Sequence, residues 1–350
     1  MSIRDAGTRA APFDDFRDLV KNLPAPDAEA LAAARARQGR LTKPPGSLGR
    51  LEQIAIWLAG WQGQEKPVIE RPMVAVFAGN HGVTARGVAP YPADVTQQMV
   101  ANFRAGGASI NQLCNSFNVG LKVFELALEL PTGDIAEKDA LSERDCAATI
   151  AYGMEAIEGI DLLCLGEMGV GNTTVASALF CALFGGEPEE WVGYGSGSTG
   201  AVLEAKIEAV RLACERVKGE TDPLVILKRV GGRELAAMVG AVLAARMQRI
   251  PVVVDGFVTS AAVAVVHKMA PGATDHCIFA HRSAEKAHRQ AVEAMGGAPL
   301  LDLGMRLGEG TGAAIAAAIV RAAAFTHSNM ATFDEAGVSG EGVNVDRAGG

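Results

Sequence analysis

The segment Asp161-Leu-Leu-Cys-Leu-Gly-Glu-Met-Gly-Val-Gly-Asn-Thr-Thr174 is the strongest indicator of the fold. A short apolar run ends in a glycine-rich loop, and an apolar stretch of helical length, 175–184, follows directly. Further strand-like runs lie at 73–78, 119–128, 251–254, 277–280 and 300–303. Such repeated strand, loop and helix units predict an α/β fold: a three-layer, doubly wound, mostly parallel Rossmann-like sheet with helices on both faces. Ligands bind such sheets at the carboxyl ends of the strands.

The 350 residues suggest about two domains, or one large α/β domain with appendages. Two helices are expected near the start, at 27–38 and about 50–62, with an irregular segment at 41–49 between them. We therefore expect a smaller helical domain over residues 1–65, which a C-terminal helix at 312–335 could complete. Residues 66–311 would form the α/β catalytic domain, and the glycine-rich, acidic stretch 336–350 a loose tail.

Composition narrows the class of protein. Hydrophobic residues make up 49% of the chain beside 41 glycines, but the aromatics are few, which is typical of closely packed helices on a sheet. The net charge of −8, without basic clusters interleaved with aromatics, argues against nucleic-acid binding, so an anionic ligand would need a local binding device. No signal peptide and no apolar run of about 20 residues is evident, which predicts a cytoplasmic protein without membrane association. Six scattered cysteines predict reduced thiols.

Two glycine-rich loops could hold an anion. The loop 166–174 opens an apolar helix, and its N–H groups and threonine hydroxyls suit a phosphate, although a simple capped turn would have the same sequence. Gly193-Tyr-Gly-Ser-Gly-Ser-Thr199 precedes a helix that carries Lys206, and a plain flexible loop is an equal alternative. Ser198 breaks the dinucleotide fingerprint and the chain has no Walker motif, so neither a standard NAD enzyme nor a Walker ATPase is indicated.

The segment Gly304-Met-Arg-Leu-Gly-Glu-Gly-Thr-Gly312 is the sharpest local signal. It places one carboxylate, Glu309, between glycines at a strand-to-helix junction, where a bound ligand could desolvate it into a general base with a raised pKa. A carboxylate that merely favours a helix N-terminus is the alternative. His81 and His281 lie at strand ends without the spacing of a zinc site, so we expect no metal and no cofactor.

Six motifs in order resemble one family, the nicotinate-nucleotide:dimethylbenzimidazole phosphoribosyltransferases. They are Thr42-Lys-Pro-Pro-Gly-Ser-Leu-Gly-Arg-Leu-Glu52, His81-Gly-Val, Gly166-Glu-Met-Gly-Val-Gly-Asn-Thr-Thr174, Asp255-Gly-Phe257, Ser283-Ala-Glu-Lys286 and Met305-Arg-Leu-Gly-Glu-Gly-Thr-Gly-Ala-Ala314. The resemblance runs from about residue 22 to residue 330. It implies transfer of the 5-phosphoribosyl group from nicotinate mononucleotide to 5,6-dimethylbenzimidazole or a related base, giving α-ribazole 5′-phosphate and nicotinate in cobalamin assembly.

The resemblance also implies site residues, a homodimer and small-molecule substrates. Glu309 would be the catalytic base, with Glu167 as a second acidic residue of the active site. The nucleotide and its phosphate would be bound by Gly169, Gly171, Asn172, Thr173, Gly195, Ser196, Lys206 and Ser283. The base pocket would include Tyr91, Gln98, Met99 and Leu307, which leaves the preferred aromatic base open. A non-catalytic nucleotide-binding sensor or carrier on the same scaffold is the alternative, and the exposed Glu309 argues against it.

Overall fold

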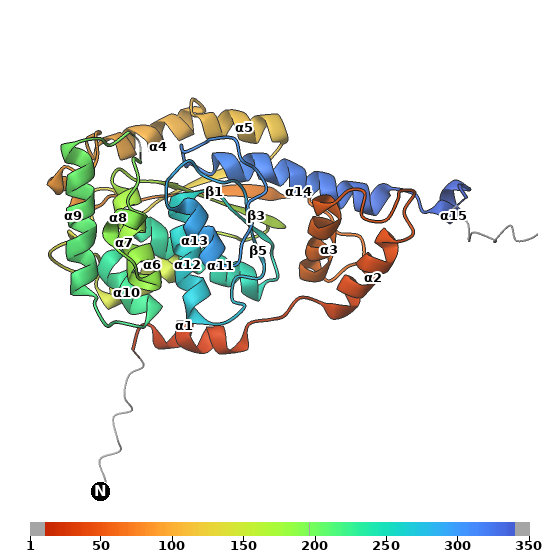
Figure 1. Cartoon of the computed structure of the whole chain (residues 1–350), viewed down its shortest axis with the longest axis horizontal. Coiled ribbons are helices and arrows are strands. Elements are labelled where there is room, and N and C mark those ends of the chain that lie inside the picture. Colours follow the sequence, from red (N-terminus) through yellow and green to blue (C-terminus); the bar gives the residue numbers. More distant parts are fainter. Residues whose placement is uncertain (1–10, 196, 340–350) are drawn as a thin grey trace, which may run out of the picture. The chain divides into compact units, whose positions relative to one another are not determined.

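A computed structural model describes residues 11–195 and 197–339, and its centre is one five-stranded sheet (Figure 1). The strands are β1 (Pro72–Ala78), β2 (Gly120–Glu125), β3 (Leu162–Met168), β4 (Val252–Val254) and β5 (Cys277–Phe279). Every neighbouring pair is parallel, in the order β2-β1-β3-β4-β5. The central strands β1 and β3 are buried along nearly their whole length, which explains why their sequences are continuous apolar runs rather than alternating ones.

The strand order creates one topological switch point. The chain leaves β1 towards β2 on one side and later returns to place β3 on the other side of β1. At the carboxyl end of this pair, Phe77 lies opposite Glu167 and Ala78 opposite Met168. Loops that leave adjacent strands in opposite directions open a crevice at this point, which is where doubly wound sheets bind ligands.

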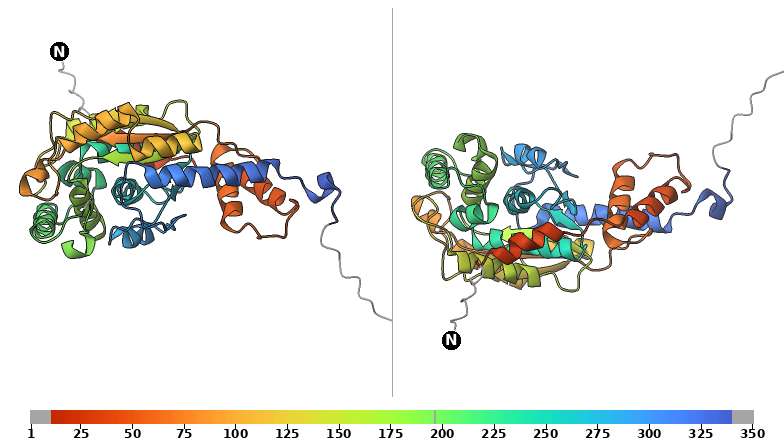
Figure 2. Two further views of the ribbon diagram at one scale, coloured as in Figure 1. Left: turned by 90° about the horizontal axis from the view of Figure 1, so that it is seen from above. Right: turned by 90° about the horizontal axis from the view of Figure 1, so that it is seen from below.

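Helices lie on both sides of the sheet (Figure 2), which confirms the predicted three-layer α/β class. Three helices, α2, α3 and α15, are described below. The others are α1 (Asp14–Leu19), α4 (Val95–Ala105), α5 (Ser109–Phe117), α6 (Glu143–Glu155), α7 (Asn172–Phe184), α8 (Pro188–Trp191), α9 (Ala201–Arg216), α10 (Pro223–Val230), α11 (Arg233–Met247), α12 (Phe257–Met269), α13 (His288–Ala294) and α14 (Thr311–Asn329), and there are short 3₁₀ turns η1 (Val20–Asn22) and η2 (Gly82–Arg86). Helices α6 and α11 pack backbone to backbone, because a Cβ on Gly153 or Gly240 would overlap a carbonyl of the facing helix. Such contacts explain the abundance of glycine and alanine.

The chain forms two compact units. The larger one comprises the stretch that ends at Pro24 together with Arg71–Ala317, and the smaller one Ala25–Glu70 together with the residues from Ala318 onward. The expectation that residues 1–65 form one domain is therefore wrong for α1. Phe13 and Phe16 of this segment are buried in the core of the larger unit, and Arg17 forms an ion pair with Asp222 at 2.7 Å.

The smaller unit contains α2 (Ala28–Gln38), α3 (Arg50–Gln62) and α15 (Phe333–Ala336). The first two helices lie where the sequence predicts them; Asp27 caps α2 by accepting from the N–H of Ala30. Arg37 donates to the carbonyls of His327, Ser328 and Met330, which ties the C-terminal segment to α2.

One local expectation differs from the structure. Residues 300–303 form an isolated parallel bridge from Leu301 to His281 rather than a strand, since Gly304, at a φ of 66°, turns the chain away immediately afterwards. Helix α15, which Thr332 caps, ends at Ala336, the first residue of the expected tail, and residues 340–350 of that tail lie outside the described residues.

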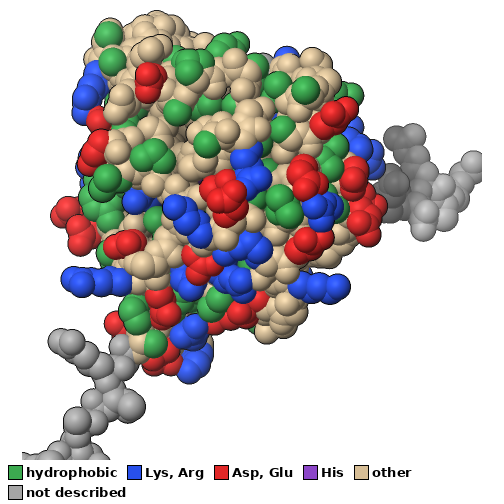
Figure 3. Space-filling model, turned by 90° about the vertical axis from the view of Figure 1, so that its left-hand side faces the viewer, with side chains coloured by type: hydrophobic (Ala, Val, Ile, Leu, Met, Phe, Trp, Pro, Cys, Tyr) green, Lys and Arg blue, Asp and Glu red, His purple; other side chains and the backbone are tan. Residues whose placement is uncertain are grey.

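The distribution of surface charge and the state of the cysteines match the expectations from the sequence. Basic and acidic side chains are interspersed on the face drawn in Figure 3. All six cysteines are free thiols, four of them buried. Within residues 11–195 and 197–339, the helices are too short or too polar to cross a membrane.

Candidate active site

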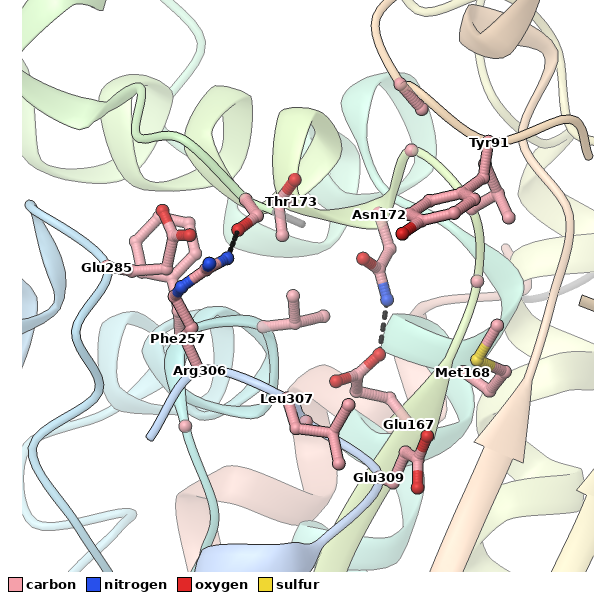
Figure 4. Close-up of a pocket in the computed structure, with 18 of the residues that line it drawn as sticks. Tyr91, Glu167, Met168, Asn172, Thr173, Phe257, Glu285, Arg306, Leu307 and Glu309 are labelled. Atoms are coloured by element: carbon pink, nitrogen blue, oxygen red, sulfur yellow. Dashed lines mark hydrogen bonds between the residues drawn. The ribbon is translucent and has the colours of Figure 1, made fainter. Parts of the chain in front are cut away.

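A cavity of about 670 Å³ opens at the carboxyl ends of the strands (Figure 4). Its walls come from segments that follow β1, β3, β4 and β5, and from the loop that precedes α14. The lining residues fall at 88–99, 167–173, Gly195, Ser198, 256–258, 281–285 and 306–309. All of these belong to the larger unit.

Glu309 lies in the wall of this cavity in a left-handed backbone conformation. Its φ is 63°, and the flanking Gly308 and Gly310 have φ values of 83° and 81°. A left-handed conformation costs a residue with a side chain roughly 1–2 kcal/mol, and such strain is typical of functional sites. The side chain is 5% exposed and its Oε2 atom is buried without a hydrogen-bond partner. Burial raises the pKa of Glu309 to about 7.

Glu167 lies at the end of β3, close to Glu309 at the base of the cavity (Figure 4). Asn172 donates to its Oε2 atom from the start of α7. Burial, with smaller contributions from the charges of Asp255 and Glu234, raises the pKa of Glu167 to about 8, and the bond from Asn172 opposes the rise. Gly308 is needed here, because a Cβ at that position would overlap the Glu167 carboxyl. The site therefore holds one protonated and one titrating carboxyl side by side near neutral pH.

The helix N-terminus predicted to bind phosphate faces the cavity. Gly171, with a φ of 87°, caps α7, and Gly169, Asn172 and Thr173 line the cavity around it. The first N–H groups of a 13-residue helix and the positive end of its dipole suit an anion. Gly195 lies against Thr173: a Cβ on Gly195 would come within 3.0 Å of the Thr173 hydroxyl.

Lys206 does not line the cavity; it is buried behind this loop. Its Nζ donates to the Thr173 hydroxyl and to the Gly193 carbonyl, both at 3.1 Å. Burial lowers the pKa of Lys206, and Glu285 partly opposes this. Lys206 thus positions Thr173 and the second glycine loop. Ser196, also predicted for this site, lies outside the described residues.

The sequence analysis missed two charged residues of the cavity, Arg306 and Glu285. Arg306 donates to the Gly195 carbonyl at 2.6 Å and lies near Thr173 in Figure 4, so a cation faces the predicted phosphate position. Arg306 lies three residues before Glu309 in the same motif, and this proximity could have identified it as a residue of the cavity. Burial raises the pKa of Glu285, with Lys206 as the main opposing charge.

Ser283 lines the cavity, and a buried histidine supports it. The N–H of Ser283 donates to His288 Nδ1 at 2.9 Å, and His288 Nε2 lies 3.0 Å from the Ser260 hydroxyl. Burial lowers the pKa of His288 to about 3, so this imidazole stays neutral. The predicted position of Ser283 beside the nucleotide site is thus compatible with the fold.

Apolar side chains also line the cavity. Tyr91, Met99 and Leu307 line it as expected, together with Val95, which lies one helical turn before Met99 on α4. Gln98 is not among the lining residues and is exposed, so the structure does not bring it to the cavity wall. The reason is helical geometry: one residue corresponds to about 100° around the axis, so the neighbour of Met99 points towards solvent.

Fold and cavity together define an α/β enzyme whose site presents a helix N-terminus, two buried carboxyls and apolar lining residues. The chain belongs to the phosphoribosyltransferase family, whose model matches residues 23–338.

Known relatives align with this chain over almost its whole length. The nicotinate-nucleotide--dimethylbenzimidazole phosphoribosyltransferase of Brucella anthropi is 62% identical over 331 residues, which cover 94% of this chain and 98% of the relative. The protein of the same name from Rhizobium meliloti is 62% identical over 330 residues, 94% and 97% of the two chains. A crystal structure of CobT from Thermus thermophilus is 43% identical with a TM-score of 0.85, and covers 89% of this chain and 99% of that one.

Proposed function

We propose that this protein transfers the 5-phosphoribosyl group of nicotinate mononucleotide to 5,6-dimethylbenzimidazole or a related azole. The products are nicotinate and α-ribazole 5′-phosphate. The second product serves the assembly of the cobalamin nucleotide loop. The names and full-length similarity of the relatives support these substrates, and a cavity lined by both polar and apolar side chains is compatible with them.

The observation that carries this proposal is the unpartnered carboxyl of Glu309. A protein that only bound or carried a nucleotide would have no use for a buried, strained and unsatisfied carboxyl in its wall. A general base is most effective when its pKa lies near the working pH, and the pKa of Glu309 is raised to about 7.

The chemistry follows from the two rings. One azole nitrogen attacks C1′ of the ribose, and Glu309 takes the proton from the other nitrogen of the azole. The bond between C1′ and the pyridinium nitrogen breaks, and its electron pair neutralises the ring to give nicotinate. Attack opposite the leaving group converts the β-nucleotide to the α-nucleotide. Proton removal by a positioned base contributes roughly 10²- to 10⁴-fold to the rate.

The nucleotide is held by its phosphate in this proposal. The α7 N-terminus with Asn172 and Thr173, the Arg306 guanidinium and Ser283 line the cavity, and Lys206 donates to the Thr173 hydroxyl from behind the loop. Glu167, protonated near neutral pH, can donate a hydrogen bond to a ribose or ring oxygen. Phosphate binding away from the reacting carbon supplies energy that can be used to align C1′ with the attacking nitrogen.

The azole then lies against Tyr91, Met99 and Leu307. These side chains offer apolar surface and one aromatic ring, which suits a methylated benzimidazole. We also propose that the enzyme works in the cytoplasm as a homodimer, which rests on the family resemblance and can be measured by light scattering.

The test incubates the protein with nicotinate mononucleotide and 5,6-dimethylbenzimidazole and follows nicotinate and α-ribazole phosphate by chromatography. We expect Glu309→Gln to bind the nucleotide normally and to lose roughly 10²- to 10⁴-fold in kcat. Glu293→Gln, on the exposed surface of α13, is the matched control and should be fully active. Absence of product with benzimidazole, its dimethyl form, adenine and phenol alike would disprove the transferase, and a fully active Glu309→Gln would remove this residue from the base role.

A further inference from the structure

The strained turn at Glu309 must be held in place by its surroundings. Three consecutive residues, 308–310, have positive φ values, and the preceding residues 304–308 form no regular structure. Within the segment, Thr311 donates from its N–H and its hydroxyl to the Gly308 carbonyl. These short-range bonds close the turn but do not fix where it lies relative to the sheet.

Asp255 provides a bond from outside the segment. It follows β4 and is 1% exposed, and its Oδ1 atom accepts the N–H of Ala313 at 2.8 Å. The N–H groups of Gly310 and Gly312 are also directed at this carboxyl. One side chain, distant in sequence, therefore accepts the N–H of Ala313 in the first turn of α14, which is one of the groups that a helix cannot satisfy internally.

The carboxyl of Asp255 has little other compensation. Its Oδ2 atom is buried without a hydrogen-bond partner. His281 Nε2 lies 3.8 Å from Oδ1, and burial lowers the pKa of His281, which favours the neutral ring. The N–H groups of α14 are thus its main stabilising contacts, and the two elements depend on each other.

The space around the turn leaves no room for adjustment. A Cβ on Gly166 of β3 would lie 2.9 Å from the Glu309 carbonyl, and one on Gly310 would lie 2.7 Å from Val74 Cγ1 of β1. A Cβ on Gly312 would overlap the ring of His281. The backbone of the turn lies directly on the two central strands, so a small displacement moves the Glu309 carboxyl within the cavity.

We propose that Asp255 is a positioning residue that fixes the left-handed turn and thereby the place of the Glu309 carboxyl. This inference rests on the proposed function of Glu309. Asp255 does not line the cavity; it acts through the backbone that follows the base. A misplacement of about 1 Å in a reacting group can cost roughly 10²-fold in rate, so loss of the Asp255 carboxyl should lower kcat without weakening nucleotide binding.

The experiment compares Asp255→Ala and Asp255→Asn in the wild-type and Glu309→Gln backgrounds. Asp255→Ala should lower kcat roughly 100-fold with KM for nicotinate mononucleotide changed less than about threefold. Asp255→Asn keeps one acceptor oxygen and should lose less. In the Glu309→Gln background Asp255→Ala should add less than about threefold, because both changes act on the same group. Equal losses in both backgrounds, or an unchanged kcat, would overturn the proposal.

A second measurement does not depend on turnover. Hydrogen–deuterium exchange of the peptide that spans 305–315 should be about tenfold faster in Asp255→Ala and faster by a smaller factor in Asp255→Asn, which serves as the readout if the alanine variant fails to fold. Asp302→Ala removes an exposed carboxylate of the same loop, paired with Arg282 at 3.3 Å, and should leave exchange and kcat unchanged. Unchanged exchange in both Asp255 variants would refute the contact. Failure of the proposed function is distinct: Glu309→Gln would then be fully active, or the wild-type protein inactive.

Discussion

Replacement of Glu309 by Gln should stabilise the folded protein at alkaline pH while it removes most of the turnover. The carboxyl is buried and its Oε2 atom has no partner, so folding removes water from a charge without compensation. Burial raises its pKa from 4.5 to about 7. The folded state therefore binds this proton more tightly than the unfolded chain. The contribution of the carboxyl to stability is complete below pH 4.5 and is lost as the pH rises through about 7.

The magnitude follows from the two pKa values. Their difference corresponds to about 3 kcal/mol in the free energy of unfolding. Gln does not titrate, so the stability of the variant relative to the wild-type protein should grow by about 2–3 kcal/mol between about pH 5 and about pH 8.5. Backbone strain at this position and the unpaired amide contribute equally at both pH values and cancel in the comparison.

Urea unfolding of both proteins, followed by far-UV circular dichroism at the two pH values, measures this change. The matched control is Glu293→Gln, where an exposed carboxylate paired with Arg289 is removed. It should alter the free energy of unfolding by less than about 0.5 kcal/mol at either pH. If the difference between Glu309→Gln and the wild-type protein is the same at both pH values, Glu309 is not a desolvated carboxyl, and the argument for its raised pKa fails.

Three further substitutions test the walls of the site. Gly308→Ala should cost roughly 1–3 kcal/mol in stability and most of the activity, because its Cβ would overlap the second carboxyl, whereas Gly304→Ala, also at positive φ but with open space, should leave activity intact. Lys206→Met should raise KM for the nucleotide about tenfold with little change in kcat, since this lysine positions the phosphate loop from behind. Met99→Gln should lower kcat/KM for dimethylbenzimidazole roughly tenfold by placing an amide in an apolar wall, whereas Gln98→Ala should have no effect on it; steady-state kinetics with both substrates measure each outcome.

The sequence predicted the elements whose local signals agree with their environment. Continuous apolar runs predicted the strands at 73–78 and 161–165, because strands buried on both faces cannot alternate; the second strand continues to Met168, into the stretch expected to be a loop. Proline, aspartate and glycine marked the ends of α2. The predicted strand at 300–303 is not formed, since the turn at Gly304 leaves only one bridge, from Leu301 to His281 beyond the end of β5.

The candidate site divides in the same way. The glycine frame around Glu309 and the loop at 166–174 were visible in the sequence, because only glycine allows the close approaches found there. Arg306 and Glu285 were not identified, since a charged residue in a loop has no local feature that separates a cavity wall from a solvated surface. Gln98 was assigned to the wall because it is adjacent to Met99 in the sequence, and only the direction of the α4 axis shows which of the two side chains faces the cavity.

What the sequence determined by itself is therefore the class of fold, the family and the identity of the carboxyl between glycines. Only the tertiary structure decided which charges share the cavity and how they are held. Asp255, 54 positions before Glu309 in the chain, accepts from the first turn of α14, and Lys206 is buried behind the cavity rather than in it. The physical reason is that the pKa of a carboxyl and the position of a strained turn depend on desolvation and on contacts across the sheet, which chain order does not encode locally.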